Sequence, residues 1–290
     1  MLKYATSFFL LLSVIFCGSG YAIQNNEKHQ PAFHTIQDVP TATWRKLEHQ
    51  RIYFGHHSVG QNILEGVKDV IAEFPQIKLN IVNIKKEDSH LSTPIFAHSK
   101  IGKNQHPISK TQRFDALMDE GLGSTSDISF FKFCFIDFNS TTDIDAVFND
   151  YSKTMARLKK KYPKTIFIHF TIPLICFPAG IDGMVMRTKN FVKKALGMDN
   201  QWDFSSSKFF NEKIREKYYG VEPLFDLAKI ESTDPTTGER NSFTSGGVTY
   251  FQLLPKFTDD GGHLNKEGRH VVAEKLLLYL ATLLEKNDKK

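Results

Sequence analysis

Cysteine is scarce in this sequence, with three residues among 290. Three cysteines are too few for a disulfide-dense scaffold or for a metal framework built from several thiolates. Two of them, Cys134 and Cys176, lie in or beside apolar runs. Such positions suit two buried free thiols as well as one bridge, and the sequence leaves both readings open.

A strong excess of one charge is also missing. The 37 Lys and Arg stand against 32 Asp and Glu, which leaves a net charge of +5. This value gives no indication of a nucleic-acid partner. Hydrophobic residues at 41% and charged residues at 24% are ordinary for a globular protein and exclude a disordered or fibrous chain.

Long apolar runs occur only at the start of the chain. Lys3 gives a basic beginning, the segment 8–16 is apolar apart from Ser13, and small residues at Gly20 and Ala22 suit cleavage by signal peptidase. The run is shorter than the roughly 20 residues that a membrane span needs. We therefore expect residues 1–22 to be a secretory signal, the product to be secreted or periplasmic, and no stable membrane span.

The rest of the chain divides into a polar arm and one domain. Residues 23–45 contain two prolines and predict a loose N-terminal arm, and residues 46–290 predict a single domain without internal repeats. Five segments predict strands: 51–54, 79–84, 128–136, 165–172 and 224–228. Segments with helical periodicity follow near 60–74, 111–122, 143–161 and 266–284.

Strands that alternate with helices predict a parallel sheet with right-handed crossovers. The expected fold class is therefore α/β, a three-layer α/β/α sandwich with a mainly parallel five-stranded sheet of flavodoxin-like kind. Sites in such folds gather at the carboxyl ends of the strands. Candidate residues are accordingly sought there.

Polar residues follow the predicted strands at this edge. Ser58 lies between the first strand and a helix, where its hydroxyl can face a cleft or simply cap the helix. Gly102 follows the second strand, and its N–H can approach a ligand closely. Asn139 follows the third strand and could direct an amide donor at developing negative charge. Each residue taken alone is equally typical of a cap or a turn.

The segment before the last helix carries a more specific pattern. Asp260 lies three residues before His263, between glycines, in a loop that leads into a helix. This spacing lets a carboxylate hold one imidazole nitrogen while the other faces a nucleophile.

Together these residues resemble the SGNH/GDSL hydrolase superfamily, whose blocks are a nucleophilic Ser, a Gly, an Asn and a closing Asp-x-x-His. The resemblance covers residues 51–284, with Ser58, Gly102, Asn139, Asp260 and His263 in the corresponding order. It departs from the family in two blocks. The usual Gly-Asp-Ser-Leu is His-His-Ser-Val here, and the usual Gly-x-Asn-Asp is Asp-Phe-Asn-Ser.

The resemblance implies a serine esterase that works without a cofactor or metal. Ser58 would be the nucleophile, His263 the base and Asp260 its partner. The oxyanion hole would comprise the N–H groups of Ser58 and Gly102 and the amide of Asn139. His57 and Asp259 are further candidate pocket residues, and Asp259 is the competing acid. The expected partner is a small-molecule or glycan ester, and the oligomeric state is undefined.

Other interpretations differ in testable ways. An α/β-hydrolase would carry Gly-x-Ser-x-Gly and separate its acid from its His, whereas residue 56 is His and the acid lies three residues away. His56 and His57 raise the alternative of a metal-dependent hydrolase, but neighbours on an extended chain point to opposite faces. A non-catalytic carbohydrate- or lipid-binding protein and an O-acyltransferase remain further alternatives.

Two long segments between the predicted elements, 174–203 and 231–257, are expected to shape the pocket, since loops carry specificity on such scaffolds. The second is rich in aromatic residues. The substrates that the resemblance allows are O-acyl or O-acetyl groups on carbohydrates, and lipid esters.

Overall fold

A parallel β-sheet forms the centre of the computed structural model, which describes residues 32–85, 90–177 and 204–287. The described residues belong to one compact unit, Pro31–Lys290. The strands are β1 (Arg51–His56), β2 (Ile81–Asn83), β3 (Ile95–Lys100), β4 (Ile128–Phe131), β5 (Ile166–Phe170) and β6 (Leu224–Phe225). They form one six-stranded sheet in the order β2-β3-β1-β4-β5-β6, and every neighbouring pair is parallel.

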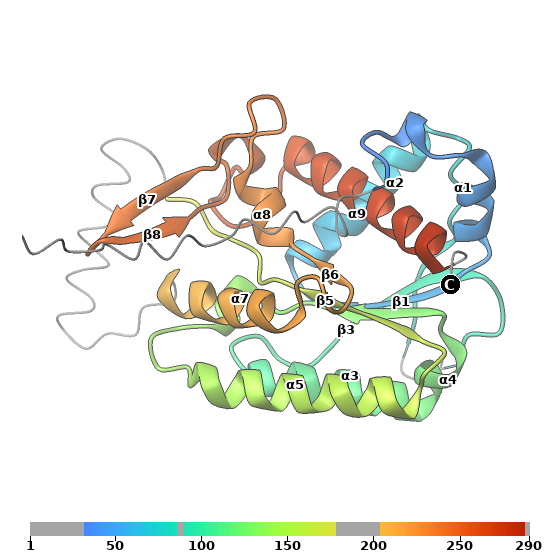
Figure 1. Ribbon diagram of the computed structural model, residues 1–290, viewed down its shortest axis with the longest axis horizontal. Coiled ribbons are helices and arrows are strands. Elements are labelled where there is room, and N and C mark those ends of the chain that lie inside the picture. The colour runs from blue at the N-terminus through green and yellow to red at the C-terminus, as the bar shows by residue number, and fades with distance from the viewer. Residues whose placement is uncertain (1–31, 86–89, 178–203, 288–290) are drawn as a thin grey trace, which may run out of the picture. The chain divides into compact units, whose positions relative to one another are not determined.

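Helices cover both faces of this sheet. The principal helices are α1 (Thr41–Glu48), α2 (Val59–Glu73), α3 (Pro107–Leu117), α5 (Ile144–Lys161), α7 (Phe204–Tyr218), α8 (Leu227–Ser232) and α9 (Lys266–Asn287). Shorter elements are η2 (Ile36–Asp38), η3 (Met118–Leu122), α4 (Gly123–Thr125), η4 (Phe135–Asp137) and η5 (Pro255–Phe257). As Figure 1 shows, α1, α2, α8 and α9 lie on one face, and α3, α5 and α7 lie on the other. The predicted three-layer α/β/α class is confirmed.

The strands are apolar on both sides, as a doubly covered sheet requires. Along β1, Ile52 and Phe54 belong to the core under α2 and α9, whereas Tyr53 belongs to the core under α3 and α5. The four residues of β4, Ile128–Phe131, are all buried. This alternation places one large side chain after another into opposite cores and fixes the register of the central strands.

The predicted number of five strands was wrong, because the sheet has a sixth strand, β3 (Ile95–Lys100), in a stretch where no strand was predicted. Its second half is His98, Ser99 and Lys100, which hides the apolar pattern. The structure buries His98 and hydrogen-bonds its Nδ1 to Nε2 of His56 at 3.0 Å. Gly102 therefore follows a central strand of the sheet rather than an edge loop.

The segment predicted as a loose arm is also corrected where the structure describes it. Ile36, Trp44 and Leu47 are buried in the core beside α9. The Thr43 hydroxyl donates to Glu285 Oε1 at 2.5 Å, and Lys46 pairs with the same carboxylate at 3.4 Å. Residues 32–48 are thus part of the domain. The predicted signal, residues 1–22, lies outside the described residues.

Helices α2 and α9 cross at very short range. A Cβ on Gly66 would lie 2.2 Å from the carbonyl oxygen of Arg269, so only glycine allows this approach. Arg269 forms ion pairs with Glu65 at 3.0 Å and Asp69 at 2.8 Å across the same crossing. The two helices that begin beside the candidate site are therefore held together as a pair.

A two-stranded antiparallel hairpin, β7 (Ser242–Ser245) with β8 (Val248–Phe251), extends away from the main sheet (Figure 1). It belongs to the segment 231–257, for which no strands were predicted.

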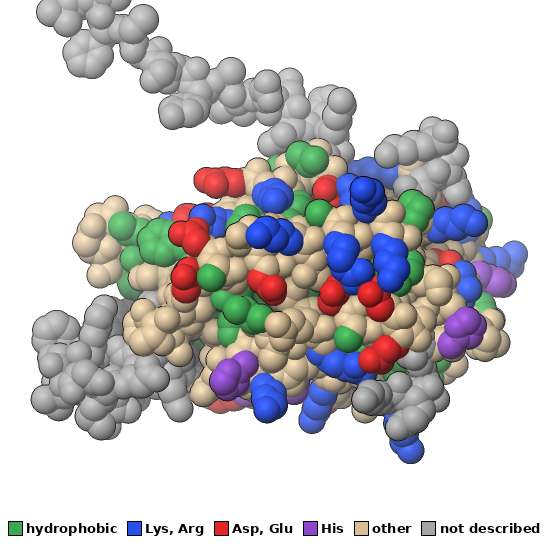
Figure 2. Space-filling view, turned by 90° about the horizontal axis from the view of Figure 1, so that it is seen from below, with side chains coloured by type: hydrophobic (Ala, Val, Ile, Leu, Met, Phe, Trp, Pro, Cys, Tyr) green, Lys and Arg blue, Asp and Glu red, His purple; other side chains and the backbone are tan. Residues whose placement is uncertain are grey.

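The surface over α5 carries charges of both signs. Figure 2 views the molecule from this side and shows Lys and Arg interspersed with Asp and Glu. Arg157 on α5 pairs with Asp115 and Asp119 on the neighbouring helices. Within the described residues, no helix is both long and apolar enough to cross a membrane.

Candidate active site

Ser58 occupies a sharp turn between β1 and α2. Its backbone angles are φ 49° and ψ −115°, in a region that residues with a side chain seldom adopt. Strain of this kind persists where the surrounding structure holds it, and it is common at functional sites. Ser58 stands at the N-cap position of α2, but its side chain makes no capping hydrogen bond. The simple capping role considered for this serine is therefore excluded.

The Ser58 hydroxyl donates instead to His263. The distance from Ser58 Oγ to His263 Nε2 is 2.6 Å, although the two residues lie 205 positions apart in the sequence. His263 Nδ1 in turn lies 2.6 Å from Asp260 Oδ2. An Nδ1–H that donates to the carboxylate leaves Nε2 as the acceptor for the serine hydroxyl, so the three residues form one continuous hydrogen-bonded chain.

Asp260 is fixed by its own loop. Its Oδ1 accepts the N–H groups of Gly262 at 2.9 Å and His263 at 2.8 Å. Partial burial favours a higher pKa, but these hydrogen bonds and the His263 ring outweigh it and lower the pKa of Asp260 to about 2. The residue is therefore a carboxylate at neutral pH and a permanent acceptor for the imidazole N–H.

The competing acid, Asp259, turns away from the histidine. Its Oδ1 accepts from Asn265 Nδ2 at 3.2 Å, near the start of α9. Asn265 also caps this helix, because its Oδ1 accepts the N–H of Gly268 at 3.0 Å. Of the two neighbouring acids, Asp260 is the one that contacts His263.

The remaining predicted residues lie at the same carboxyl edge of the sheet. Gly102 has φ 60°, and a Cβ there would lie 2.6 Å from the backbone nitrogen of Lys110, so a side chain is excluded. Its carbonyl faces His57, whose Nε2 lies 3.3 Å away. Burial and the charge of Lys110 lower the pKa of His57. Gly102 is thus adjacent to the residue that precedes Ser58.

The side-chain oxygen of Asn139 accepts hydrogen bonds from residues of its own turn. Oδ1 accepts from Thr141 N at 2.9 Å, Thr141 Oγ1 at 2.7 Å and Thr142 Oγ1 at 3.2 Å. This arrangement leaves the Nδ2 group as the donor end of the side chain. Within the described part of the chain, no hydrogen bond joins Gly102 or Asn139 to Ser58.

A buried ion pair that the sequence did not reveal ties these two loops together. Lys110 and Asp137 have fully buried side chains and lie 2.5 Å apart. Asp137 also accepts the N–H groups of Gln105 at 2.9 Å and Cys134 at 2.7 Å. The ion pair joins α3 to the segment after β4, the Gln105 hydrogen bond joins the loop after β3 to the same carboxylate, and removal of either partner of the pair would leave a buried charge. The only signal in the sequence was an acid two residues before Asn139.

His56 and His57 point in different directions, as expected for neighbours on an extended chain. His56 is buried against His98, and burial together with the His98 charge lowers the pKa of His56 to about 2. Its ring is therefore neutral. In the described residues, no group of three or more His, Cys, Asp or Glu side chains could hold a metal ion. Cys134 and Cys176 are buried and free.

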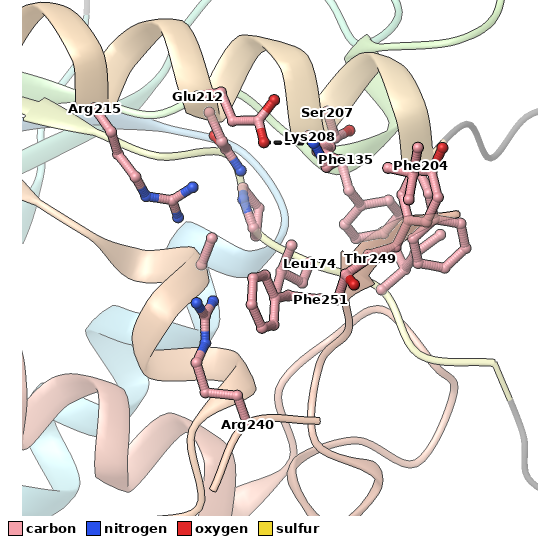
Figure 3. A pocket seen from close by; sticks show the side chains of 16 residues that line it. Phe135, Leu174, Phe204, Ser207, Lys208, Glu212, Arg215, Arg240, Thr249 and Phe251 are labelled. Atoms are coloured by element: carbon pink, nitrogen blue, oxygen red, sulfur yellow. Dashed lines mark hydrogen bonds and ion pairs between the residues drawn. The ribbon is translucent and has the colours of Figure 1, made fainter. Parts of the chain in front are cut away.

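A cavity of about 350 Å³ is lined by Phe135, and neither Ser58 nor His263 is among its lining residues. Phe135 links the cavity to the histidine, because it lines the cavity and its ring packs edge-to-face with the ring of His263, with 5.9 Å between ring centroids. The other walls come from the chain after β5, from α7 and α8, and from the hairpin β7–β8 (Figure 3). Both segments expected to shape the pocket contribute, through Leu174 and Ile175 and through Arg240 and 248–251.

The cavity wall is connected directly to the histidine loop. Cys176, beside the wall residue Ile175, donates its N–H to the carbonyl of Gly261 at 2.7 Å. The aromatic hairpin was recognised in the sequence as a pocket segment, but its contact with Phe204 of α7 was not. Phe135 also escaped notice, because a phenylalanine in an apolar run gives no functional signal.

No protein-family model matches this sequence, and no curated protein matches it. Solved structures similar to this chain include an acetyl xylan esterase, with 13% identity, a TM-score of 0.41 and coverage of 78% of this chain and 97% of that one. A carbohydrate esterase family 3 protein from Talaromyces cellulolyticus has 13% identity and a TM-score of 0.42, with coverage of 81% and 97%.

A third similar structure is the periplasmic domain of a lipopolysaccharide acetyltransferase from Salmonella ser. Paratyphi A. It has 10% identity and a TM-score of 0.42, and covers 79% of this chain and 83% of that one. Because the identities are low, the site must be understood from the geometry of this chain's own residues.

Proposed function

We propose that this protein is a secreted serine esterase of SGNH type. It hydrolyses an ester through an acyl intermediate on Ser58, and the ester is an O-acyl or O-acetyl group on a carbohydrate, or a lipid ester. The single observation that carries the proposal is the hydrogen-bonded chain from Ser58 through His263 to Asp260, with 2.6 Å at each step. A histidine that accepts from a serine hydroxyl and donates to a carboxylate is the arrangement that activates a serine as a nucleophile.

The reaction begins with attack of Ser58 Oγ on the ester carbonyl. His263 Nε2 takes the hydroxyl proton, and the Asp260 carboxylate stabilises the imidazolium through the Nδ1–H that it already accepts. The tetrahedral intermediate expels the alcohol, which receives the proton from His263. Water, deprotonated by the same nitrogen, then attacks the acyl group and releases the acid and the free serine.

The negative charge of the tetrahedral intermediate needs donors that are already in place. We assign this role to the N–H groups of Ser58 and Gly102 and to the Nδ2 group of Asn139. The assignment is supported by the absence of any partner for these three donors among the described residues. Removal of one such donor typically lowers kcat by about 10²–10³-fold.

Replacement of the nucleophile is the direct test. Ser58→Ala should lower the hydrolysis of 4-nitrophenyl acetate by about 10³-fold or more and leave the thermal unfolding midpoint nearly unchanged, because only one hydrogen bond of a surface hydroxyl is lost. Ser124→Ala is a matched control. Ser124 lies in α4, before β4 and so at the opposite edge of the sheet, and its loss should not affect the rate. Hydrolysis by Ser58→Ala at the wild-type rate would rule out the proposed nucleophile.

Covalent labelling distinguishes an esterase from a non-catalytic binding protein. A fluorophosphonate reacts with an activated serine and not with an ordinary one. We expect the label on Ser58, found by peptide mass spectrometry, and its loss in His263→Ala. A wild-type protein that stays unlabelled would favour the binding-protein alternative.

A further inference from the structure

One end of the cavity beside His263 is lined by arginines. Arg215 on α7 and Arg240, which precedes β7, point into it from opposite sides, as Figure 3 shows. Arg215 is neutralised by Asp226, whose carboxylate accepts its Nε at 2.8 Å and its Nη2 at 2.7 Å. Arg240 has no such carboxylate, and the described residues form no ion pair with it.

Arg240 is nevertheless held in one position. Its Nε and Nη2 donate to the hydroxyl of Ser232 at 3.0 and 2.9 Å. Its guanidinium lies over the ring of Phe251, 3.3 Å from the centroid. Because Ser232 is fully buried and itself donates to the carbonyl of Ala228, the head group is positioned by one polar and one aromatic contact.

Two of the remaining hydrogen-bond donors of Arg240 lie side by side. A guanidinium has five N–H donors, and Ser232 takes one at Nε and one at Nη2, which leaves two on Nη1 and one on Nη2. The Nη1–Nη2 edge therefore offers the parallel donors that bind a carboxylate through both oxygens.

The local charge indicates which anion fits. Arg240, Arg215 and Lys208 all line the cavity; Asp226 pairs with Arg215, and Glu212 pairs with Lys208. These three cations and two carboxylates leave one positive charge. Burial and the proximity of Arg215 lower the pKa of Arg240, and the charge of Asp226 opposes them only in part. One negative charge, as on a carboxylate, balances the site, whereas a phosphate dianion would exceed it.

The remaining walls suit an apolar body attached to that anion. Leu174 and Phe251 line the cavity between Arg240 and Phe135, and Phe204 and Tyr250 extend the aromatic lining. The ring of Phe135 also packs against the ring of His263. A ligand whose carboxylate meets Arg240 therefore places its apolar part along Leu174 and Phe251 toward Phe135, the wall residue that contacts the histidine.

We propose that Arg240 is a specificity-determining residue that binds a carboxylate carried by the substrate. The ester hydrolysed at Ser58 then belongs to a molecule with an apolar or aromatic segment that ends in a free carboxylate. This assignment of substrate class rests on the proposed esterase function, whereas the carboxylate site itself does not depend on it.

Binding can be measured without catalysis. In the Ser58→Ala protein, 4-phenylbutyrate and its neutral amide, 4-phenylbutanamide, are compared by ligand-observed NMR titration. We expect the carboxylate to bind about ten-fold or more tightly than the amide, and Arg240→Gln to remove this preference. Arg113→Gln removes a surface arginine that pairs with Glu120 and should leave the preference intact. Equal binding of the two ligands, or a preference that survives Arg240→Gln, would overturn the site.

Inhibition links the site to the reaction. In the wild-type protein, 4-phenylbutyrate should compete with the hydrolysis of 4-nitrophenyl acetate, and the amide should compete about ten-fold less well. Binding that depends on Arg240 but does not compete with hydrolysis would overturn the assignment of substrate class. If no ester is hydrolysed, the esterase proposal fails, while the titrations still decide whether Arg240 binds carboxylates.

If Arg240→Gln does not fold, a salt titration of the wild-type protein tests the site instead. The preference for the carboxylate over the amide must fall as salt is raised, because the attraction is between charges. A salt-independent preference would overturn the site.

Discussion

At the scale of single residues, two adjacent aspartates differ in one contact. Asp260 accepts from the His263 ring, and Asp259 accepts from Asn265. Asp260→Asn should lower kcat by about 10³–10⁴-fold, because an amide stabilises the wrong imidazole tautomer and cannot balance the imidazolium charge. Asp259→Asn is the matched control and should stay within a few-fold of the wild type. Steady-state kinetics on an aryl ester checks both variants, and equal losses in the two would contradict the assignment.

The buried side chain of Glu231 should make the stability of the folded protein depend on pH. Its Oε2 accepts the N–H of Leu174 at 2.6 Å, and its buried Oε1 has no hydrogen-bond partner among the described residues. Burial raises the pKa of Glu231 to about 8, against the smaller opposing effects of the Leu174 hydrogen bond and the Lys132 charge. The folded protein therefore keeps this proton at neutral pH.

The consequence is a definite slope of stability with pH. Between pH 4.5, where the unfolded side chain loses its proton, and about pH 8, the folded state binds one proton more. The contribution of Glu231 to the free energy of unfolding then falls by about 1.4 kcal/mol per pH unit. Glu231→Gln mimics the protonated form and should lose this slope, whereas exposed Glu239→Gln should keep it. Urea unfolding at pH 5, 6.5 and 8 tests this, and parallel curves for wild type and Glu231→Gln would show that the proton is absent.

At the scale of elements, α1 belongs to the core although its sequence suggested a loose arm. Trp44 is 2% exposed and packs in the cluster beside α9. Trp44→Ala should lower the free energy of unfolding by about 3–5 kcal/mol, as expected for a large buried ring. Trp44→Phe keeps most of the apolar volume and removes an indole N–H for which the described part of the chain offers no partner, so it should cost much less. A small loss in both variants, measured by denaturant unfolding, would mean that α1 does not stabilise the domain.

The difference between α1 and its prediction has a physical reason. The segment has prolines at positions 31 and 40, many polar residues and no periodic pattern of apolar residues. Pro40, however, immediately precedes the first turn of the helix. Ile36, Trp44 and Leu47 hold this segment in the core beside α9, together with the contacts of Thr43 and Lys46 with Glu285. Local composition did not reveal them because they depend on a helix more than 200 residues away.

At the scale of the whole molecule, periodicity and strand-end positions predicted the layers and brought Ser58, Asp260 and His263 together. These features follow from local patterns: apolar strands, amphipathic helices and an acid three residues from a histidine. Residues that act through distant contacts were not predictable. The Lys110–Asp137 pair joins α3 to η4. The guanidinium of Arg240 is positioned by Ser232 and Phe251, which its neighbours in the sequence do not reveal.

The turn at Ser58 and the loop at His263 are joined by a hydrogen bond across 205 residues of chain. A ribosome therefore completes the serine long before it makes the base that would activate it, and α9, which follows the histidine loop and packs on α2, is made later still. Whatever reactivity Ser58 has can arise only after synthesis of the sheet is finished. The Ser58 hydroxyl would thus stay unactivated throughout translation. Esterase activity would then be a property of the completed fold and not of a nascent fragment.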